Sequence, residues 1–392
     1  MSKILSQKFN KQQKNRPHVA PLYGLILGHL TVDWYSGVLK PLLPLIMQTF
    51  SLTAGQTALI PSVMGILTAF FQPLGAVIGE KAGEKFVVIF SILLSVIFIP
   101  LIGISKSLIL FLIFLSIGLI GNSMFHPNAA SLVGALGFEK SHTAMSLFSI
   151  GGTVGSGLAP VMIIVFVNKF GFSHMPFLSF AGLLITGLTA VLIFSHKQKV
   201  EIEKASFSLS SFLDKKGVFS LLAVNILRSF AIIGFSTLIP LYLVSIGYSA
   251  IWGSYFLTSS RFSGAIGTYL GAVLSDKIGP KQVNKISLLA GTIFALLFLA
   301  FKNIYLMIVF FFFAFLFWFF TMGANVTYMQ SLLPEKKGIA SSLSMGISWG
   351  AASVLLSALS FFIDIAGLKI IFYIVFLASP LAFLLSYKLF ER

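Results

Sequence analysis

One apolar stretch near the start of the chain carries three ionisable side chains. Residues 20–49 are long and apolar enough to cross a bilayer, yet they contain His29, Asp33 and Lys40. A charge at the centre of a membrane helix costs about 2.5–3.5 kcal/mol on insertion scales, so such residues usually face a protein interior or a water-filled path. If the stretch is one helix, the three side chains fall within about 40° of one another around its axis. The spacing therefore indicates a polar face that lines a cavity.

The chemistry that these side chains offer is proton exchange. Histidine titrates near neutral pH and can relay protons, and a second histidine, His126, precedes Pro127 in a later apolar stretch. We therefore predict that Asp33, His29 and His126 couple the protein to protons. The alternatives are that Asp33 only neutralises a buried Arg, and that His126 only bonds a backbone carbonyl near the proline.

Two arginines also lie within apolar stretches. Arg keeps its charge in essentially any protein setting, so Arg228 and Arg261 each need an anion nearby. With Lys40 they give the interior an excess of positive charge, which favours an anionic substrate with phosphonate or carboxylate oxygens. The alternative is a structural Arg that bonds carbonyl groups. Polar and aromatic side chains orient ligands in such pockets, and the remaining predicted substrate-binding residues are Asn225, Tyr242, Trp318 and Asn325.

The composition indicates a membrane protein with many spans. Of 392 residues, 57% are hydrophobic and 10% are charged, with a mean hydropathy of +0.97, whereas soluble domains carry about 25% charged residues. The net charge of +16 is spread over short loops between apolar runs, so we expect no nucleic-acid partner. The chain has no cysteine, and the sequence exposes no metal constellation, phosphate loop or nucleophile–base pair. We therefore expect no enzyme, no metal and no cofactor.

Apolar runs of spanning length can be counted along the whole chain. Twelve follow one another, approximately at 20–49, 54–79, 86–104, 107–136, 143–167, 175–194, 218–246, 250–275, 283–301, 303–332, 339–363 and 368–388. With a cytoplasmic N-terminus, twenty Lys and Arg residues fall in inner segments and four in outer loops. This positive-inside bias predicts that both termini are cytoplasmic.

An internal repeat divides the spans into two sets. The segments Gly75–Lys85 (GAVIGEKAGEK) and Gly271–Lys281 (GAVLSDKIGPK) are offset by 196 residues, and the same offset aligns Pro44 with Pro240. A parallel repeat of six spans is typical of one class of secondary transporter. We therefore predict an all-α membrane protein, a 6+6 pseudo-two-fold bundle of twelve transmembrane helices. Its parts are a cytoplasmic tail (1–19), a first bundle (20–194), a cytoplasmic linker (195–217), a second bundle (218–388) and a cytoplasmic C-terminus (389–392).

The repeated loop resembles the loop motif of the major facilitator superfamily, roughly G-x-L-x-D-R-x-G-R-R. The resemblance implies a charged latch in which an acid near a helix end holds the cytoplasmic side closed. The alternative is a set of ordinary inner-loop charges. The matching gating residues are Asp276, Lys277 and Gly279 in the second copy and Glu80, Lys81 and Gly83 in the first, where Glu84 departs from the usual basic residue.

Within that superfamily the chain more closely resembles the fosmidomycin resistance protein family. The matching points include His29-x3-Asp33, Phe125-His126-Pro127 and the run MSLFSIGGTVGSGLAP at Met145–Pro160, which has Ala159 where the antiporter pattern has Gly. The resemblance implies a monomeric, proton-coupled exporter of a small anionic or amphiphilic compound, such as a phosphonate drug, in the inner membrane of a bacterium. In this mechanism, protonation near Asp33 weakens an ion pair with an Arg and lets the halves rock. A symporter or uniporter that imports a metabolite remains the alternative, and a receptor or channel is a further one.

Overall fold

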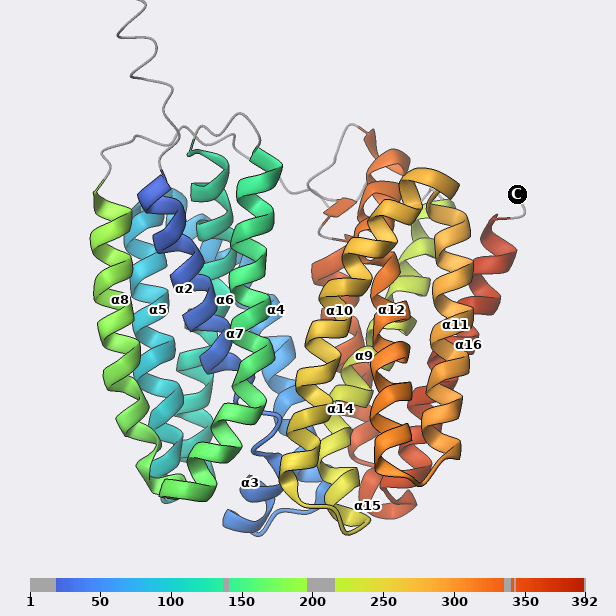
Figure 1. Ribbon diagram of the computed structural model, residues 1–392, viewed down its shortest axis with the longest axis horizontal. Helices are drawn as coiled ribbons and strands as arrows, with labels where there is room; N and C mark the ends of the chain where they lie inside the picture. Colours follow the sequence, from blue (N-terminus) through green and yellow to red (C-terminus); the bar gives the residue numbers. More distant parts are fainter. Residues whose placement is uncertain (1–18, 137–140, 196–215, 335–339, 342, 391–392) are drawn as a thin grey trace, which may run out of the picture. The chain divides into compact units, whose positions relative to one another are not determined.

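The computed structural model consists of helices joined by short turns (Figure 1). It describes residues 19–136, 141–195, 216–334, 340–341 and 343–390. The predicted tail (1–19) and linker (195–217) therefore lie almost wholly outside the described residues, and the predicted C-terminus (389–392) lies half outside them, because α16 extends to Phe390. In the first half the helices are α2 (Val19–Gly37), α3 (Leu43–Thr49), α4 (Ala54–Ala82), α5 (Glu84–Leu101), α6 (Leu108–Gly134), α7 (Ser141–Phe170) and α8 (Leu178–Phe194), with short 3-10 turns at Ile102–Ile104 and Phe172–Phe177.

The second half repeats this pattern of long apolar helices. Its helices are α9 (Lys216–Ser245), α10 (Ala250–Ile278), α11 (Pro280–Ala300), α12 (Ile304–Leu332), α14 (Ser348–Ser360), α15 (Ile363–Ala366) and α16 (Leu368–Phe390), with a π-helical turn at Leu343–Ile347 before α14. Most boundaries fall within a few residues of the predicted spans. The prediction of an all-α membrane protein is confirmed.

Ten helices in the described part of the chain are long and apolar enough to cross a membrane. The two predicted spans outside this set correspond to α2 and α10. Both are less apolar for a visible reason, because α2 contains His29 and Asp33 and α10 contains Arg261 among several Ser and Thr residues. Large apolar side chains such as Phe70 and Leu184 are 68% and 76% exposed, as expected for surfaces that face lipid.

The first predicted span is not one helix. The helix α2 ends at Gly37, residues 38–42 form turns, and α3 begins at Leu43. Pro41 has no N–H to donate to the Gly37 carbonyl, which explains why the helix ends there. The prediction that Lys40 shares one helical face with His29 and Asp33 was therefore wrong. In the second half Pro240, the equivalent of Pro44, lies inside the continuous helix α9.

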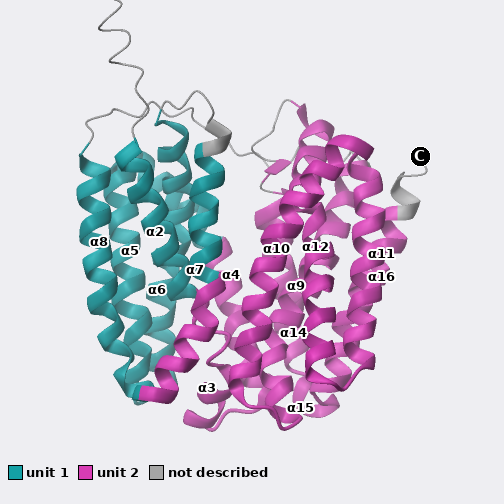
Figure 2. Cartoon of the chain, viewed as in Figure 1, with its two compact units in different colours: residues 1–36, 70–156, 170–203 teal, residues 37–69, 157–169, 204–392 magenta. Residues whose placement is uncertain are grey.

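The chain packs as two compact units (Figure 2). Unit 1 comprises residues 1–36, 70–156 and 170–203, and unit 2 comprises residues 37–69, 157–169 and 204–392. Segments of the first half, among them α3 and the start of α4, thus cluster with the second half. The predicted division into bundles at 20–194 and 218–388 stays a prediction.

Close helix contacts in unit 1 depend on glycine. A Cβ on Gly155 of α7 would overlap the Leu30 carbonyl of α2, and a Cβ on Gly151 would come within 2.7 Å of the Ile26 carbonyl oxygen. Small residues of this kind let helix backbones approach one another in membranes. They bring α7 against the face of α2 that carries His29.

Unit 2 has a core of aromatic side chains. Phe235 of α9 contacts Trp318 of α12 edge to face, with ring centroids 5.2 Å apart, and contacts Phe372 of α16 at the same distance. Edge-to-face pairs of this kind add about 0.5–1.5 kcal/mol beyond the area that they bury. These contacts hold α9, α12 and α16 together around the polar residues of α9.

The two loop glycines of the repeat have the same backbone conformation. Gly83 follows α4 with φ 95° and Gly279 follows α10 with φ 82°. Positive φ is strained for residues with a Cβ, so each copy needs glycine at this position. The acids and bases of the loop motif lie in the last turns of α4 and α10, directly before these glycines.

A carboxylate caps the start of α4 from a distant part of unit 2. Thr53 and Gln56 form a reciprocal capping box, with N–H contacts of 3.0 and 3.1 Å. Asp364 of α15 accepts hydrogen bonds from the Gly55 N–H at 2.9 Å and from the Thr53 hydroxyl at 2.5 Å. A Cβ on Gly55 would lie 2.6 Å from Asp364 Oδ2. The cap therefore joins residues more than 300 positions apart.

We predict that Thr53→Ala destabilises the folded protein, because it removes the N-cap of α4 and one donor to Asp364. The loss should be about 1 kcal/mol, visible as a melting temperature a few degrees lower for the detergent-purified protein. The matched control is Thr53→Ser, which keeps the hydroxyl and should melt close to the parent. Equal melting of the Ala and Ser variants would show that the cap contributes nothing.

Candidate functional site

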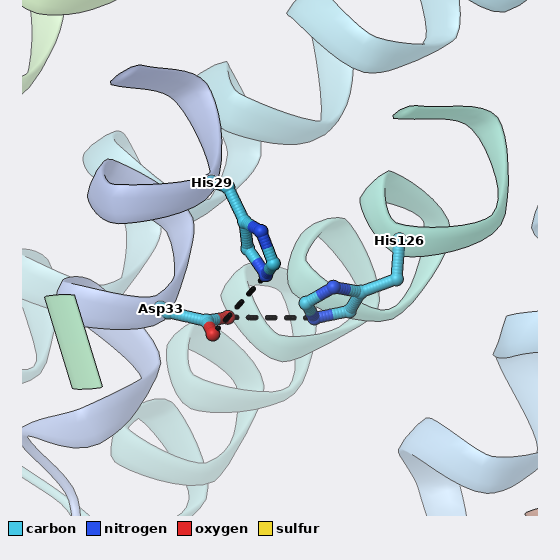
Figure 3. Close-up of side chains that lie close together, drawn as sticks. All are labelled: His29, Asp33 and His126. Carbon is cyan, nitrogen blue, oxygen red and sulfur yellow. Dashed lines mark ion pairs between the residues drawn. The ribbon is translucent and has the colours of Figure 1, made fainter. Parts of the chain in front are cut away.

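Three side chains of unit 1 converge on one point (Figure 3). His29 and Asp33 lie one turn apart on α2, and their Nε2 and Oδ2 atoms are 3.4 Å apart. His126 reaches the other oxygen from α6, with Nε2 3.4 Å from Asp33 Oδ1. The exposed fraction of the side chain is 10% for His29, 19% for Asp33 and 31% for His126. The carboxylate therefore lies between two imidazoles.

The His29 ring is fixed by α7. Its Nδ1 lies 2.8 Å from the backbone carbonyl of Phe148, and the Phe148 ring stacks on it with centroids 4.1 Å apart. A carbonyl oxygen only accepts, so the Nδ1–H donates and Nε2 faces Asp33. Gly152, one turn after Phe148, leaves room for the ring, since a Cβ there would overlap Nε2. The glycine run of α7 thus positions the site.

Asn122 completes the cluster and was missed at the level of sequence. Its Nδ2 lies 3.3 Å from Asp33 Oδ1 and 3.4 Å from the Val32 carbonyl. Asn122 and His126 are four residues apart on α6, which is the same spacing as His29 and Asp33 on α2. In each helix this spacing places the two side chains on the same face. The spacing of Asn122 and His126 is the sequence signal that could have identified Asn122.

The arrangement suits binding and release of a small cation. One carboxylate is shared by two imidazoles and an amide, and the groups are enclosed by apolar helices with part of His126 left open to solvent. A proton can be exchanged among groups at this spacing. Among the described residues these three also form the one group whose His and carboxylate atoms lie close enough to hold a metal ion, all within 4.8 Å.

Lys40 lies in unit 2, on the turn after α2. Its Nζ donates to the Ser236 hydroxyl at 2.6 Å. Ser236 is 196 positions further along the chain, which is the period of the repeat. Equivalent residues of two repeats contact each other only where they lie close to the pseudo-two-fold axis that relates the repeats, so Lys40 and Ser236 lie near that axis. Arg261 of α10 is near enough to repel the Lys40 ammonium, so two cations share this part of the unit.

Arg228 is buried in unit 2, where its guanidinium contacts uncharged side chains. Its exposed fraction is 1%, its Nη1 donates to the Thr321 hydroxyl at 2.6 Å, and Nη2 lies 3.7 Å from the Met322 sulfur. Its Nε has no hydrogen-bond partner among the described residues. A buried cation of this kind is expensive unless an anion reaches it. The Nε–H of Arg228 is therefore a candidate donor to an anion.

The polar and aromatic residues predicted with Arg228 all contact other side chains of unit 2. Asn325 donates to Asn225 at 2.6 Å and accepts from Asn284 at 2.5 Å, and all three are buried. The Trp318 indole donates to Ser379 at 2.8 Å. Tyr242 packs on Phe372 with centroids 4.9 Å apart. These contacts hold α9, α11, α12 and α16 together, and the predicted contact with substrate stays a prediction.

The gating residues are placed but not joined by ion pairs in the described structure. Glu80 and Lys81 lie at the end of α4, and Asp276 and Lys277 lie at the end of α10. Glu84, the residue that departs from the loop motif, is 8% exposed in the first turn of α5, with its carboxyl near Ser131 of α6. A carboxylate at a helix N-terminus is favourable. Its burial against α6 was not foreseen.

Comparison with protein families gives a match over most of the chain. Residues 25–357 match the profile of the Major Facilitator Superfamily. Among curated proteins, the chain is 24% identical over 372 residues to the fosmidomycin resistance protein of Escherichia coli K12, covering 92% of this chain and 90% of that protein. It is 27% identical over 390 residues to the uncharacterized MFS-type transporter YfnC of Bacillus subtilis, covering 91% and 90% of the two chains.

Solved structures show the same fold at low sequence identity. A crystal structure of the nucleoside transporter NupG superposes with a TM-score of 0.77 at 14% identity, covering 95% of this chain and all of that one. A crystal structure of a D-xylose-proton symporter superposes with a TM-score of 0.73 at 12% identity, covering 96% and 98%. These proteins carry different cargo, so the shared fold identifies no substrate.

We predict that Gly152→Ala destabilises the protein, because the added methyl group overlaps the His29 ring. Overpacking of this kind costs about 1–3 kcal/mol. The matched control is Gly187→Ala in α8, where a Cβ meets nothing within 4 Å. Thermal unfolding of the purified variants should give a lower melting temperature for Gly152→Ala alone. A melting temperature equal to that of the parent would show that α7 does not hold the ring in place.

Proposed function

Because the chain belongs to the Major Facilitator Superfamily, we propose that it is a proton-coupled exporter of a small anionic or amphiphilic compound. It is a multi-pass membrane protein and a secondary transporter. Export is supported by its relatives, which include the fosmidomycin resistance protein and multidrug resistance proteins named MdtG. A phosphonate-type drug is the substrate class that fits both this similarity and the cations of unit 2, of which Arg228 is buried, Lys40 is partly buried and Arg261 is exposed.

The observation that carries the proposal is the carboxylate of Asp33 between His29 and His126. Burying a carboxylate within a membrane span costs free energy, and such residues usually mark the path of a proton, an ion or a substrate. The two imidazoles at 3.4 Å give it partners that can donate and accept protons. In this proposal the cluster takes up a proton on one side of the membrane and releases it on the other.

Transport follows alternating access. Proton binding changes the charge of the Asp33 cluster, and anion binding changes the charge around Arg228. Coupling arises when the two ligands stabilise different conformations, because a ligand with equal affinity for both shifts nothing. Asp33 belongs to unit 1 and Arg228 to unit 2, and the ion pair expected between Asp33 and an Arg stays a prediction.

Arg228 is the proposed anchor for the anionic group of the substrate. A guanidinium can bind two oxygens of a phosphonate or carboxylate at once, and the Arg228 Nε has no acceptor within the part of the chain that the structure describes. Lys40 and Arg261 add positive charge. Asn225, Tyr242, Trp318 and Asn325 are proposed to contact the rest of the substrate once the helices move.

The proposal also covers the orientation of the chain in the membrane and the loops that close its cytoplasmic side. We place both termini in the cytoplasm of a bacterial cell, from the excess of basic residues in alternate loops. The loops of Glu80, Lys81 and Gly83 and of Asp276, Lys277 and Gly279 then lie on the cytoplasmic side, where they act as the latch. The protein functions as a monomer with no cofactor.

The second candidate is an importer, either a proton symporter or a uniporter. Its support is the D-xylose-proton symporter, which shares the fold. Reconstitution in proteoliposomes with a pH gradient of either sign separates the two. An antiporter accumulates substrate when the lumen is acidic, a symporter when the outside is acidic, and a uniporter in neither case.

We predict that Asp33→Asn abolishes gradient-driven transport in such proteoliposomes. The amide keeps the size of the side chain but neither carries a negative charge nor takes up a proton near neutral pH, so the driving force is lost. Counterflow of substrate without a gradient should persist if the fold is intact. The control is His174→Gln, at an exposed histidine in the 3-10 turn Phe172–Phe177, outside the cluster, which should transport normally. Undiminished gradient-driven transport by Asp33→Asn would refute the proposed coupling.

We predict that Arg228→Gln weakens transport of an anionic phosphonate by raising its KM about tenfold or more, since a hydrogen bond to a charged group contributes about 1.5–3 kcal/mol. Arg228→Lys keeps the charge but loses the bidentate geometry, so its KM should fall between those of the parent and the Gln variant. The measurement is uptake kinetics for the phosphonate and for an uncharged analogue. An equal change for both compounds would argue against an anion site.

A further inference from the structure

The cluster on α2 and α6 has the composition of a transition-metal site. It offers two imidazole nitrogens and one carboxylate, and their ligand atoms lie within 4.8 Å of one another. Around a four-coordinate Zn²⁺ with bonds of about 2.0–2.1 Å, neighbouring ligand atoms lie about 3.3–3.4 Å apart. Both nitrogen–oxygen distances in the cluster are 3.4 Å. The two contacts are to different oxygens of Asp33, so a carboxylate that binds through both oxygens would share one ion with the two imidazole nitrogens.

The hydrogen bond of His29 argues in the same direction. Its Nδ1–H donates to the Phe148 carbonyl at 2.8 Å, so a neutral ring directs the lone pair of Nε2 towards Asp33 Oδ2. Two lone pairs that face each other need a positive charge between them, which is either a proton or a metal ion. Metal-binding histidines usually donate their second N–H to a carbonyl or carboxylate in this way. The Phe148 carbonyl has that role here.

The surroundings add a fourth position and a route of entry. Asn122 lies 3.3 Å from Asp33 Oδ1, and a half turn of its amide would present the oxygen to an ion. The His126 side chain is 31% exposed, so the site is open beside His126. Apolar rings cover the His29 side, where Phe125 of α6 and Phe148 of α7 pack on His29 with ring centroids 5.8 and 4.1 Å apart. An enclosed site with one open position can exchange its ion.

The donor set selects the class of ion. Mg²⁺ and Ca²⁺ prefer sites made only of oxygen ligands, whereas two imidazoles and a carboxylate suit Zn²⁺, Co²⁺ or Ni²⁺. With neutral rings the cluster carries one negative charge, so a divalent ion is attracted to it. A proton and a metal ion would occupy the same position.

We propose that His29, Asp33 and His126 bind one divalent transition-metal ion, and that this ion excludes the transported proton. The site itself depends on the ligand positions, and only the effect on transport rests on the proposed function. Bound metal then inhibits gradient-driven transport. The protein is thereby sensitive to zinc at its coupling residues.

The test is a Co²⁺ titration of the full-length protein in detergent, followed by its visible d–d absorption, with Zn²⁺ added to displace the cobalt. We expect saturation at one equivalent. Asp33→Asn and His126→Gln should each weaken binding at least about tenfold, since even second-shell changes cost 10–100-fold. The exposed His174 is the matched control, and His174→Gln should bind like the parent. Thermal melting of each variant checks that it is folded.

The outcomes separate this proposal from the proposed function. Saturable binding that is lost in both cluster variants, together with Zn²⁺ inhibition of transport, supports the metal site. Absence of one-equivalent binding, or binding that survives in Asp33→Asn and His126→Gln, overturns it. Transport by the metal-free protein is measured separately with a chelator. If Asp33→Asn then transports normally, proton coupling fails, whether or not metal binds.

Discussion

The structure depends on how a carboxylate is accommodated inside an apolar helix bundle. Asp33 lies between two imidazoles at 3.4 Å, in a span where an isolated charge would cost several kcal/mol. Three neighbouring groups position this cluster. The carbonyl of Phe148 orients His29, Gly152 leaves space for the ring, and Asn122 contacts the second oxygen. A cluster held from three helices cannot lose one member without disturbing the others.

The two halves of the repeat have diverged in charge. At the offset of 196 residues, His29 corresponds to Asn225, Asp33 to Ser229 and His126 to Met322. The second half thus replaces every ionisable member of the cluster with a neutral residue and places the buried Arg228 beside Ser229. In the proposed function, the Asp33 cluster of the first copy binds the proton and Arg228 of the second copy binds the anionic substrate.

Packing also departs from the simple picture of two equal bundles. Residues 37–69 and 157–169 cluster with the second half of the chain, and their contacts include hydrogen bonds such as Lys40 with Ser236 and Gly55 with Asp364. Buried apolar side chains of the same segments, such as Leu43 and Ile46, add to this packing. Each hydrogen bond contributes only about 0.5–1.5 kcal/mol, so these polar contacts can form and break individually.

The sequence by itself determined the membrane class, the helical spans, the repeat and the residues that could carry charge, because hydropathy and spacing are local properties of the chain. It identified His29 and Asp33 as neighbours, since four residues make one helical turn. It could not show that His126 meets Asp33, that α2 ends before Lys40, or that Asn225 and Asn325 bond each other, since these depend on how distant helices pack. Only the tertiary structure decided which polar groups share a site, because burial and contact arise between segments that the order of residues does not bring together.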